Sequence, residues 1–300
     1  MDLIEDWIDH LRRQGRSEKT LRAHRLGVTH LADWYRHSYG QPFDPAELVR
    51  RDVVDWKAHQ QTVGKAAPAT VNQRLVAVSG FFEWAVSNGH AARNPAAAVR
   101  GIALPARRPK ALDGRQLRRL GRQVERAGSE RDLALVELLV GTGLRVSEAL
   151  GLQMGDVRMT ERNGEVIVRM GKKGNYRRVP LTASVRSALR VYLATLDAPP
   201  GNDDLLWRGQ RGSLVSPSSV FKLLRNYARQ AGLEEELVSP HVLRHTFATR
   251  YLAANPGDLR GLAAILGHRS LDTVMVYTEP TAEDLTARMA RAETGRPEDE

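Results

Sequence analysis

The sequence has no cysteine among its 300 residues. This absence excludes disulfide bridges, thiolate metal sites, iron–sulfur clusters and a catalytic thiol. Long apolar runs are missing too, since none approaches the ~18 residues that a membrane-spanning helix needs. The N-terminus, from Met1 to Asp6, is acidic and lacks the plan of a signal peptide. We therefore expect a cytoplasmic protein with no membrane partner.

Lysine is also scarce, because arginine supplies most of the 45 basic side chains against 35 acidic ones. The formal net charge is +10. Arginine is the better bidentate ligand for phosphate, so a polyanionic partner is one interpretation of this composition. An arginine-rich protein from a GC-rich genome is the other, and the charge alone does not choose between them.

A basic stretch at 102–111 divides the chain. It holds two prolines and three cations and has no apolar periodicity, which is typical of a linker. We predict a first domain at 1–103, a linker at 104–111, a second domain at 112–292 and a polar tail at 293–300. Hydrophobic residues make up 42% of the chain, enough for a core in each domain.

Helical signals fill the first domain. Ser17 offers an N-cap, and apolar residues such as Val28 and Leu31 then recur at helical spacing. A second apolar stripe begins after Pro68 and ends before Asn88. The opposite faces are basic, which suits either a solvated surface or a surface that faces DNA.

The second domain mixes helices and strands. An apolar run at 131–140 predicts a buried helix that is broken by the glycines after it. Strands are expected at 165–169 and 177–181, with a hairpin turn at 171–175 between them. Further helices are expected at 183–196, 217–231, 240–253, 258–266 and 270–277. The predicted fold class is therefore mainly α with a small antiparallel β-sheet.

His241 and Arg244 stand three residues apart in the first turns of an expected helix. Free backbone N–H groups and the helix dipole favour an anion there, so the pair suits a phosphate oxygen. A packing contact for His241 and a solvated Arg244 are the alternative. His241 and His245 also have a spacing that zinc ligands use. We expect no metal there, because no thiolate and no third ligand accompany them.

Arg145 follows the broken apolar run, where a fixed cation needs a nearby anion. That anion is either a ligand or Glu148, three residues further on. Lys172 and Lys173 lie in the hairpin turn. They are either ordinary exposed side chains, or one of them reaches into a site as a proton donor.

Tyr277 ends a short expected helix, nine residues after His268. A tyrosine has a pKa near 10, so it needs cations or a base nearby to attack at pH 7. Taken alone, Tyr277 fits a packed aromatic side chain better than a nucleophile.

Together and in this order, these motifs resemble those of the tyrosine recombinase (phage integrase) family, and most of all its Xer-type members. The stretch at 65–97 resembles the family's core-binding domain, and 112–290 resembles its catalytic domain. The resemblance implies a helical, SAM-like core-binding domain followed by an α+β catalytic domain. Because helical signals begin almost at Met1, we expect no arm-binding domain ahead of it.

The resemblance also implies a role for each motif residue. Arg145 and Arg244 clamp the scissile phosphate, and His268 donates a hydrogen bond to it. Tyr277 is the nucleophile, and His241 assists the transfer of its proton. The tyrosine conserves the bond energy as a 3′-phosphotyrosine, so no ATP, metal or other cofactor is expected.

A hairpin lysine then protonates the departing 5′-oxygen. Counting without gaps to the Val-Pro-Leu strand selects Lys172, which we prefer. The Lys-Gly-Asn tripeptide selects Lys173.

The implied function is site-specific DNA recombination through a Holliday junction. Its expected partners are double-stranded DNA with an inverted-repeat site and further copies of the chain, which form a tetramer on DNA. A related recombinase or an accessory protein is a further candidate partner. Integration, transposition and the resolution of chromosome or plasmid dimers all remain open as the biological role.

Two other functions compete with this one. A type IB topoisomerase shares the tyrosine chemistry but does not pair two sites, and the Xer-like motif spacing argues against it. A DNA-binding protein with a vestigial site is the other, and the full set of catalytic residue types argues against that.

Overall fold

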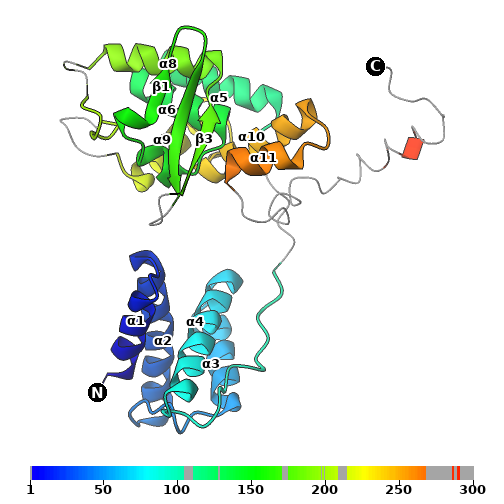
Figure 1. The fold of residues 1–300 in the computed structure, drawn as a ribbon. Helices are drawn as coiled ribbons and strands as arrows, with labels where there is room; N and C mark the ends of the chain where they lie inside the picture. The colour runs from blue at the N-terminus through cyan, green and yellow to red at the C-terminus, as the bar shows by residue number, and fades with distance from the viewer. Residues whose placement is uncertain are drawn as a thin grey trace. The chain divides into compact units, whose positions relative to one another are not determined.

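The computed structural model describes residues 2–104, 111–127, 129–170, 175–196, 198, 200–208, 215–267, 286 and 289–290. The chain divides into two compact units, Met1–Arg107 and Arg108–Glu300. The first unit is a bundle of helices, and the second combines helices with one small sheet (Figure 1). The boundary between the units falls inside the stretch predicted as a linker, 104–111.

The first unit contains α1 (Leu3–Arg13), α2 (Glu18–Tyr39), α3 (Arg50–Thr62) and α4 (Pro68–Ser87). Ser17 caps α2 as predicted, since its side chain accepts a hydrogen bond from the backbone N–H of Thr20 at 3.2 Å. α2 ends at Gly40, whose φ of 67° is the left-handed conformation that favours glycine. Local sequence signals thus account for where this helix starts and stops.

Aromatic side chains dominate the core of the first unit. Trp7, Trp56, Phe81 and Phe82 are all buried, and the rings of Trp7 and Phe81 meet edge to face with centroids 5.6 Å apart. They come from α1, α3 and α4, so these three helices close over one cluster. The first unit therefore has a core of its own.

The second unit begins with three helices, α5 (Gly114–Arg126), α6 (Glu130–Thr142) and α7 (Val146–Leu150). The sheet follows, with strands β1 (Val157–Met159), β2 (Gly164–Met170) and β3 (Asn175–Pro180). After it come α8 (Ala183–Ala194), α9 (Pro217–Gln230), α10 (Pro240–Ala254) and α11 (Leu259–Leu266). Short 3-10 helices lie at Met154–Asp156 and Glu235–Leu237.

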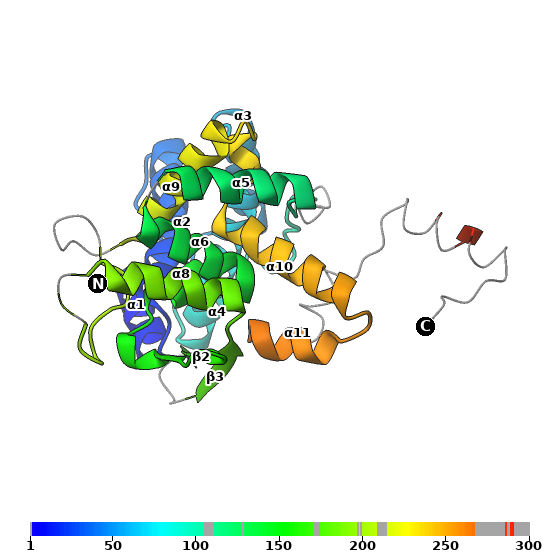
Figure 2. The same cartoon turned by 90° about the horizontal axis from the view of Figure 1, so that it is seen from above.

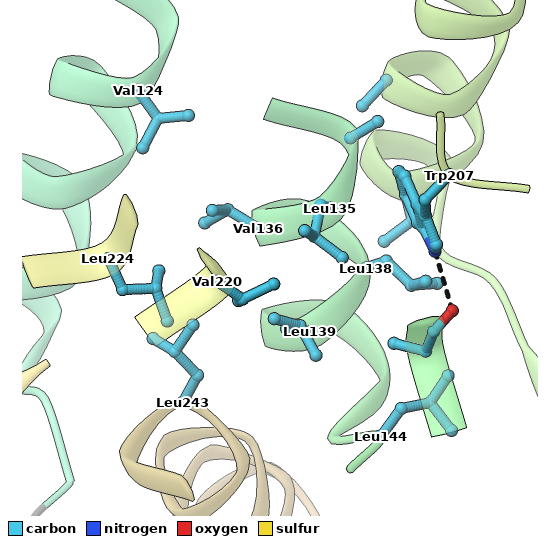
Figure 3. Close-up of a cluster of buried hydrophobic side chains, with 14 of the residues drawn as sticks. Val124, Leu135, Val136, Leu138, Leu139, Leu144, Trp207, Val220, Leu224 and Leu243 are labelled. Atoms are coloured by element: carbon cyan, nitrogen blue, oxygen red, sulfur yellow. Dashed lines mark hydrogen bonds between the residues drawn. The ribbon is translucent and has the colours of Figure 1, made fainter. Parts of the chain in front are cut away.

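Helix α6 is the centre of the second unit. It lies between α5 and α8 and also packs against α10 (Figure 2). Its side chains Leu135, Leu138 and Leu139 are buried and point into the cluster drawn in Figure 3. Trp207 closes one end of this cluster, where its Nε1 donates to the carbonyl of Ala149 at 2.7 Å. Every residue of the run at 131–140 is buried or half-buried, as the sequence predicted for this helix.

The sheet has the order β1-β2-β3, and both pairs are antiparallel. Val166 of β2 lies opposite both Val157 and Val179, and all three side chains are buried. Because side chains alternate along a strand, Arg177 shares the inward face of β3 with Val179. Helix α11 packs beside β3.

The predicted fold class is confirmed: the chain is mainly helical, with one small antiparallel sheet. The helix expected at 131–140 runs further, from Glu130 to Thr142, and the two expected strands are also longer. Strand β1 was not predicted, because three residues give too little alternation to recognise. Of the turn expected at 171–175, Asn175 is instead the first residue of β3, and the rest lies outside the described residues, as does the helix expected at 270–277. Within the described residues, no helix is long and apolar enough to span a membrane.

Candidate active site

Arg145 opens α7 directly after the end of α6. Helix α6 stops at Gly143, which has a φ of 63°. A Cβ atom at this position would lie 2.5 Å from Cδ1 of Phe247 and 2.8 Å from the side chain of Leu266. Only glycine satisfies both the conformation and the space. The tight turn therefore sets Arg145 close to where α10 and α11 pack against the end of α6.

Arg244 is buried in α10, with 4% of its surface exposed. Its Nη1 donates to the carbonyl of Gly143 at 2.7 Å, and its Nη2 donates to the carbonyl of Leu266 at 2.9 Å. These carbonyls stand at the C-terminal ends of α6 and α11, where backbone acceptors lack helical partners. The guanidinium thus joins two helix ends and is held in one position.

Glu148 holds Arg145 at two points. One carboxylate oxygen accepts from the backbone N–H of Arg145 at 2.9 Å, and the other accepts from its Nη1 at 3.0 Å. The Arg145 side chain remains 47% exposed, so its guanidinium is held on one edge and open to solvent elsewhere. The interpretation of Glu148 as the structural partner of Arg145 is confirmed.

A second arginine, Arg177 of β3, bonds the same carboxylate. Its Nη2 and Nη1 donate to the two oxygens of Glu148 at 2.8 and 3.2 Å, and its Nε donates to the carbonyl of Ile265 at 2.7 Å. Burial alone would raise the pKa of Glu148. The hydrogen bonds from Arg177 and Arg145 outweigh it and hold the pKa below its ordinary value. Glu148 is therefore ionised at neutral pH.

His241 lies in the first turn of α10, where Ser239 is the N-cap and Pro240 the first helical residue. Its Nε2 is 2.9 Å from Nε2 of His245, and the two rings meet edge to face. Burial lowers the pKa of His245 to about 4, with His241 and Arg244 adding to the effect. His245 is therefore neutral at pH 7. The two histidines form a hydrogen bond and do not repel each other as two positive charges.

Of the predicted site residues, the structure places Arg244 against Gly143, two residues before Arg145, and His241 one turn before Arg244 on α10. The hairpin lysines, Lys172 and Lys173, lie outside the described residues, as do His268 and Tyr277. The alternative of a solvated Arg244 is wrong, because the side chain is buried. Among the residues described, no cluster of three or more metal-ligating side chains occurs.

This arrangement suits the binding of an anion. Arg145 presents a half-exposed cation. Arg244 fixes the C-terminal ends of α6 and α11, which Arg145 and His268 follow in the sequence. Fixed cations stabilise charge that develops on phosphate oxygens, which is the main requirement of phosphoryl transfer.

Arg177 was not among the residues predicted for the site. A signal was present, because Arg177 is two residues from Val179 and alternation places both on the buried face. An arginine that points inward from a strand needs a buried carboxylate or carbonyl, and here it has both.

Comparisons with known protein families match both units. Residues 110–284 match the phage integrase family, and residues 3–89 match the N-terminal SAM-like domain of phage integrases. The first of these matches covers more than half of the chain.

Curated relatives match over most of their length. The tyrosine recombinase XerC of Rhodospirillum centenum is 33% identical over 93% of this chain and 82% of its own. The XerC of Escherichia coli O157:H7 is 35% identical over 78% of this chain and 75% of its own. The tyrosine recombinase XerD of Listeria monocytogenes is 29% identical over 93% and 94% of the two chains.

Solved structures share the fold. XerH recombinase in a post-cleavage complex with its difH substrate superposes with a TM-score of 0.76, at 22% identity over 91% of this chain and 80% of that one. The integrase of transposon Tn1549, in complex with circular intermediate DNA, gives 0.74 at 18% identity over 96% and 99%. A lambda integrase dimer bound to a core site gives 0.72 at 19% identity over 92% and 93%.

Proposed function

The chain belongs to the phage integrase family of tyrosine recombinases, and from that premise we propose that it is a site-specific DNA recombinase. It cuts one strand of each duplex by attack of Tyr277, holds the 3′ end as a phosphotyrosine and rejoins strands through a Holliday junction. Integration, transposition and dimer resolution all use this chemistry.

One observation carries the proposal. Arg244 bonds the carbonyls of Gly143 and Leu266. Gly143 stands two residues before Arg145, and Leu266 stands two residues before His268. A buried arginine thus ties together three motifs, one of which lies about a hundred residues before it in the chain and one 22 residues after it. Packing alone does not require this convergence of cations, whereas a phosphate ligand does.

The proposed roles follow from charge. Arg145, Arg244 and His268 stabilise the negative charge on the nonbridging oxygens of the scissile phosphate. His241 assists removal of the proton from Tyr277, and a hairpin lysine protonates the departing 5′-oxygen. Lys172 remains preferred to Lys173 for that step.

Two assays test the function against the topoisomerase alternative. DNA retained by a Tyr277→Phe variant from fragmented genomic DNA is sequenced to find the target site. Supercoiled plasmids with and without that site are then incubated with the natural protein. Strand joining between two sites supports the recombinase, and relaxation of every plasmid supports a topoisomerase.

DNA binding should depend steeply on salt. The affinity for a random-sequence duplex is expected to fall with a log–log slope of about −0.9 per phosphate neutralised, because binding releases counterions. With six or more phosphate contacts, the loss between 50 and 200 mM salt is about a thousandfold. Fluorescence anisotropy measures it, and a slope near zero would reject binding through the charge of +10.

The proposed tetramer depends on the C-terminal segment. Thr286, Met289 and Ala290 are helical, and the Met289 side chain is 67% exposed. An exposed apolar side chain such as that of Met289 fits a docking surface on a neighbouring protomer. In the sequence, Leu285 and Met289 are four residues apart, a spacing that places both on one face of a helix, and Leu285 lies outside the described residues.

Truncation after Thr281 is therefore expected to leave binding to a half-site intact and to abolish cooperative binding to a full site. Gel shifts on half and full sites measure both, and strand exchange is expected to disappear with the cooperativity. Truncation after Arg291 removes only the polar tail and is the matched control. Unchanged cooperativity in the shorter protein would mean that the segment docks on its own protomer.

A further inference from the structure

We propose that Arg177 is a positioning residue for DNA cleavage, which orients the carboxylate of Glu148 and through it the guanidinium of Arg145. The inference rests on the proposed function, in which Arg145 contacts the scissile phosphate.

The contacts form a chain from the sheet to the site. Arg177 grips both oxygens of Glu148 from β3, at 2.8 and 3.2 Å. Glu148 in turn accepts from the backbone and from the side chain of Arg145, at 2.9 and 3.0 Å. The two hydrogen bonds from Arg177 fix the plane of the Glu148 carboxylate as well as its position. The direction of the Arg145 side chain is therefore set by a residue that does not face solvent.

Arg177 is not placed as a phosphate ligand itself. All three of its guanidinium nitrogens donate to protein acceptors, two oxygens of Glu148 and the carbonyl of Ile265. Arg145 donates only to Glu148 within the described parts of the chain. One arginine is thus committed to the protein, while the other is held on one edge and open on the rest.

The backbone at the end of α11 leaves space for the Arg177 side chain because residue 267 is a glycine. The chain passes so close to Arg177 at the end of α11 that a Cβ atom on Gly267 would lie 2.6 Å from its Nη1. Gly267 also has a φ of 68°, so both the backbone conformation and the limited space favour glycine there. A buried ion pair adds little stability compared with apolar residues of the same volume. The two hydrogen bonds from Arg177 orient the carboxylate of Glu148, and an apolar pair would not do so.

The test uses single-turnover cleavage of a nicked suicide duplex that carries the target site, at saturating protein. Arg177→Met is expected to slow covalent attachment by about 10- to 100-fold, the usual cost of losing a residue that orients a site ligand. The protein concentration at half-saturation is expected to change less than twofold, since Arg177 does not touch DNA. A defect in folding alone would instead lower the amount of active protein and leave its rate constant unchanged.

A double-mutant cycle separates action through Glu148 from any other effect. Glu148→Gln is expected to slow cleavage to a similar extent. The double variant, Glu148→Gln with Arg177→Met, is expected to be no more than about twofold slower than Glu148→Gln alone, because the carboxylate through which Arg177 acts is already gone. Costs that multiply in the double variant would overturn the proposal.

Arg178→Met is the matched control. Arg178 is the next residue on β3, but its side chain is 55% exposed and lies 3.6 Å from Glu165. This variant is expected to cleave within about twofold of the natural rate, because exposed ion pairs contribute little. If Arg177→Met fails to fold, Arg177→Lys takes its place in the cycle. Lysine keeps the buried charge but cannot form the paired hydrogen bonds of a guanidinium to both carboxylate oxygens.

The outcomes are distinct. An active natural protein with a fully active Arg177→Met variant overturns this inference and leaves the proposed function standing. A natural protein that forms no covalent complex on its retained DNA overturns the proposed function itself.

Discussion

Tyr277→Phe is expected to abolish covalent attachment of the protein to a suicide DNA substrate, while DNA affinity stays nearly unchanged. Phenylalanine keeps the ring but removes the oxygen that forms the phosphotyrosine bond. Denaturing gel electrophoresis of labelled DNA detects the covalent complex, and a gel shift measures binding.

Tyr176→Phe is the control for this variant. Tyr176 lies on β3 and is 59% exposed, so its hydroxyl is accessible. It is expected to form the covalent complex at the natural rate. A complex that persists in Tyr277→Phe and disappears in Tyr176→Phe would transfer the role of nucleophile to Tyr176.

Replacement of either site arginine is expected to slow cleavage by two orders of magnitude or more, because each removes fixed charge from the transition state. The structure predicts that the two variants differ in stability. Arg145→Ala removes a half-exposed side chain and should leave Tm nearly unchanged. Arg244→Ala removes the donor for two helix-end carbonyls and should cost about 2 kcal/mol, which is roughly 4–8 °C in Tm.

Arg250→Ala is the matched control, because Arg250 is an exposed arginine on the same helix as Arg244. Its cleavage rate and Tm should both stay close to natural values. Single-turnover kinetics and thermal unfolding by circular dichroism measure the two effects separately. A loss of rate below about tenfold for Arg145→Ala or Arg244→Ala would remove that residue from the site.

Much of the fold was readable from the sequence because the signals are local. The apolar run before Gly141 marks α6. Ser216-Pro217 and Ser239-Pro240 each combine an N-cap with a proline at the first helical position, and they mark the starts of α9 and α10. Alternation of apolar residues marks β2 and β3, whereas β1 has only three residues and was missed. Periodicity and capping depend on neighbours a few residues away, so one chain carries them in full.

The candidate site divides in the same way. Order and spacing along the chain singled out Arg145, His241, Arg244 and the two residues beyond Gly267, His268 and Tyr277. A motif states which residue types occur, but it does not state where a long side chain points. Free rotation about several bonds lets an arginine reach either solvent or the interior, so the sequence left both open for Arg244.

Tertiary structure alone decided what each charged group does. It turned Arg244 inward onto the carbonyls of Gly143 and Leu266, 101 and 22 residues away. It also gave Glu148 a second arginine, Arg177, from 29 residues along the chain. Buried charges take their partners from whatever the packing of α6, β3, α10 and α11 brings within hydrogen-bond reach. Such distances in sequence leave no periodic trace, so the residues proposed to do the chemistry were found in the sequence, whereas their buried partners were found in the fold.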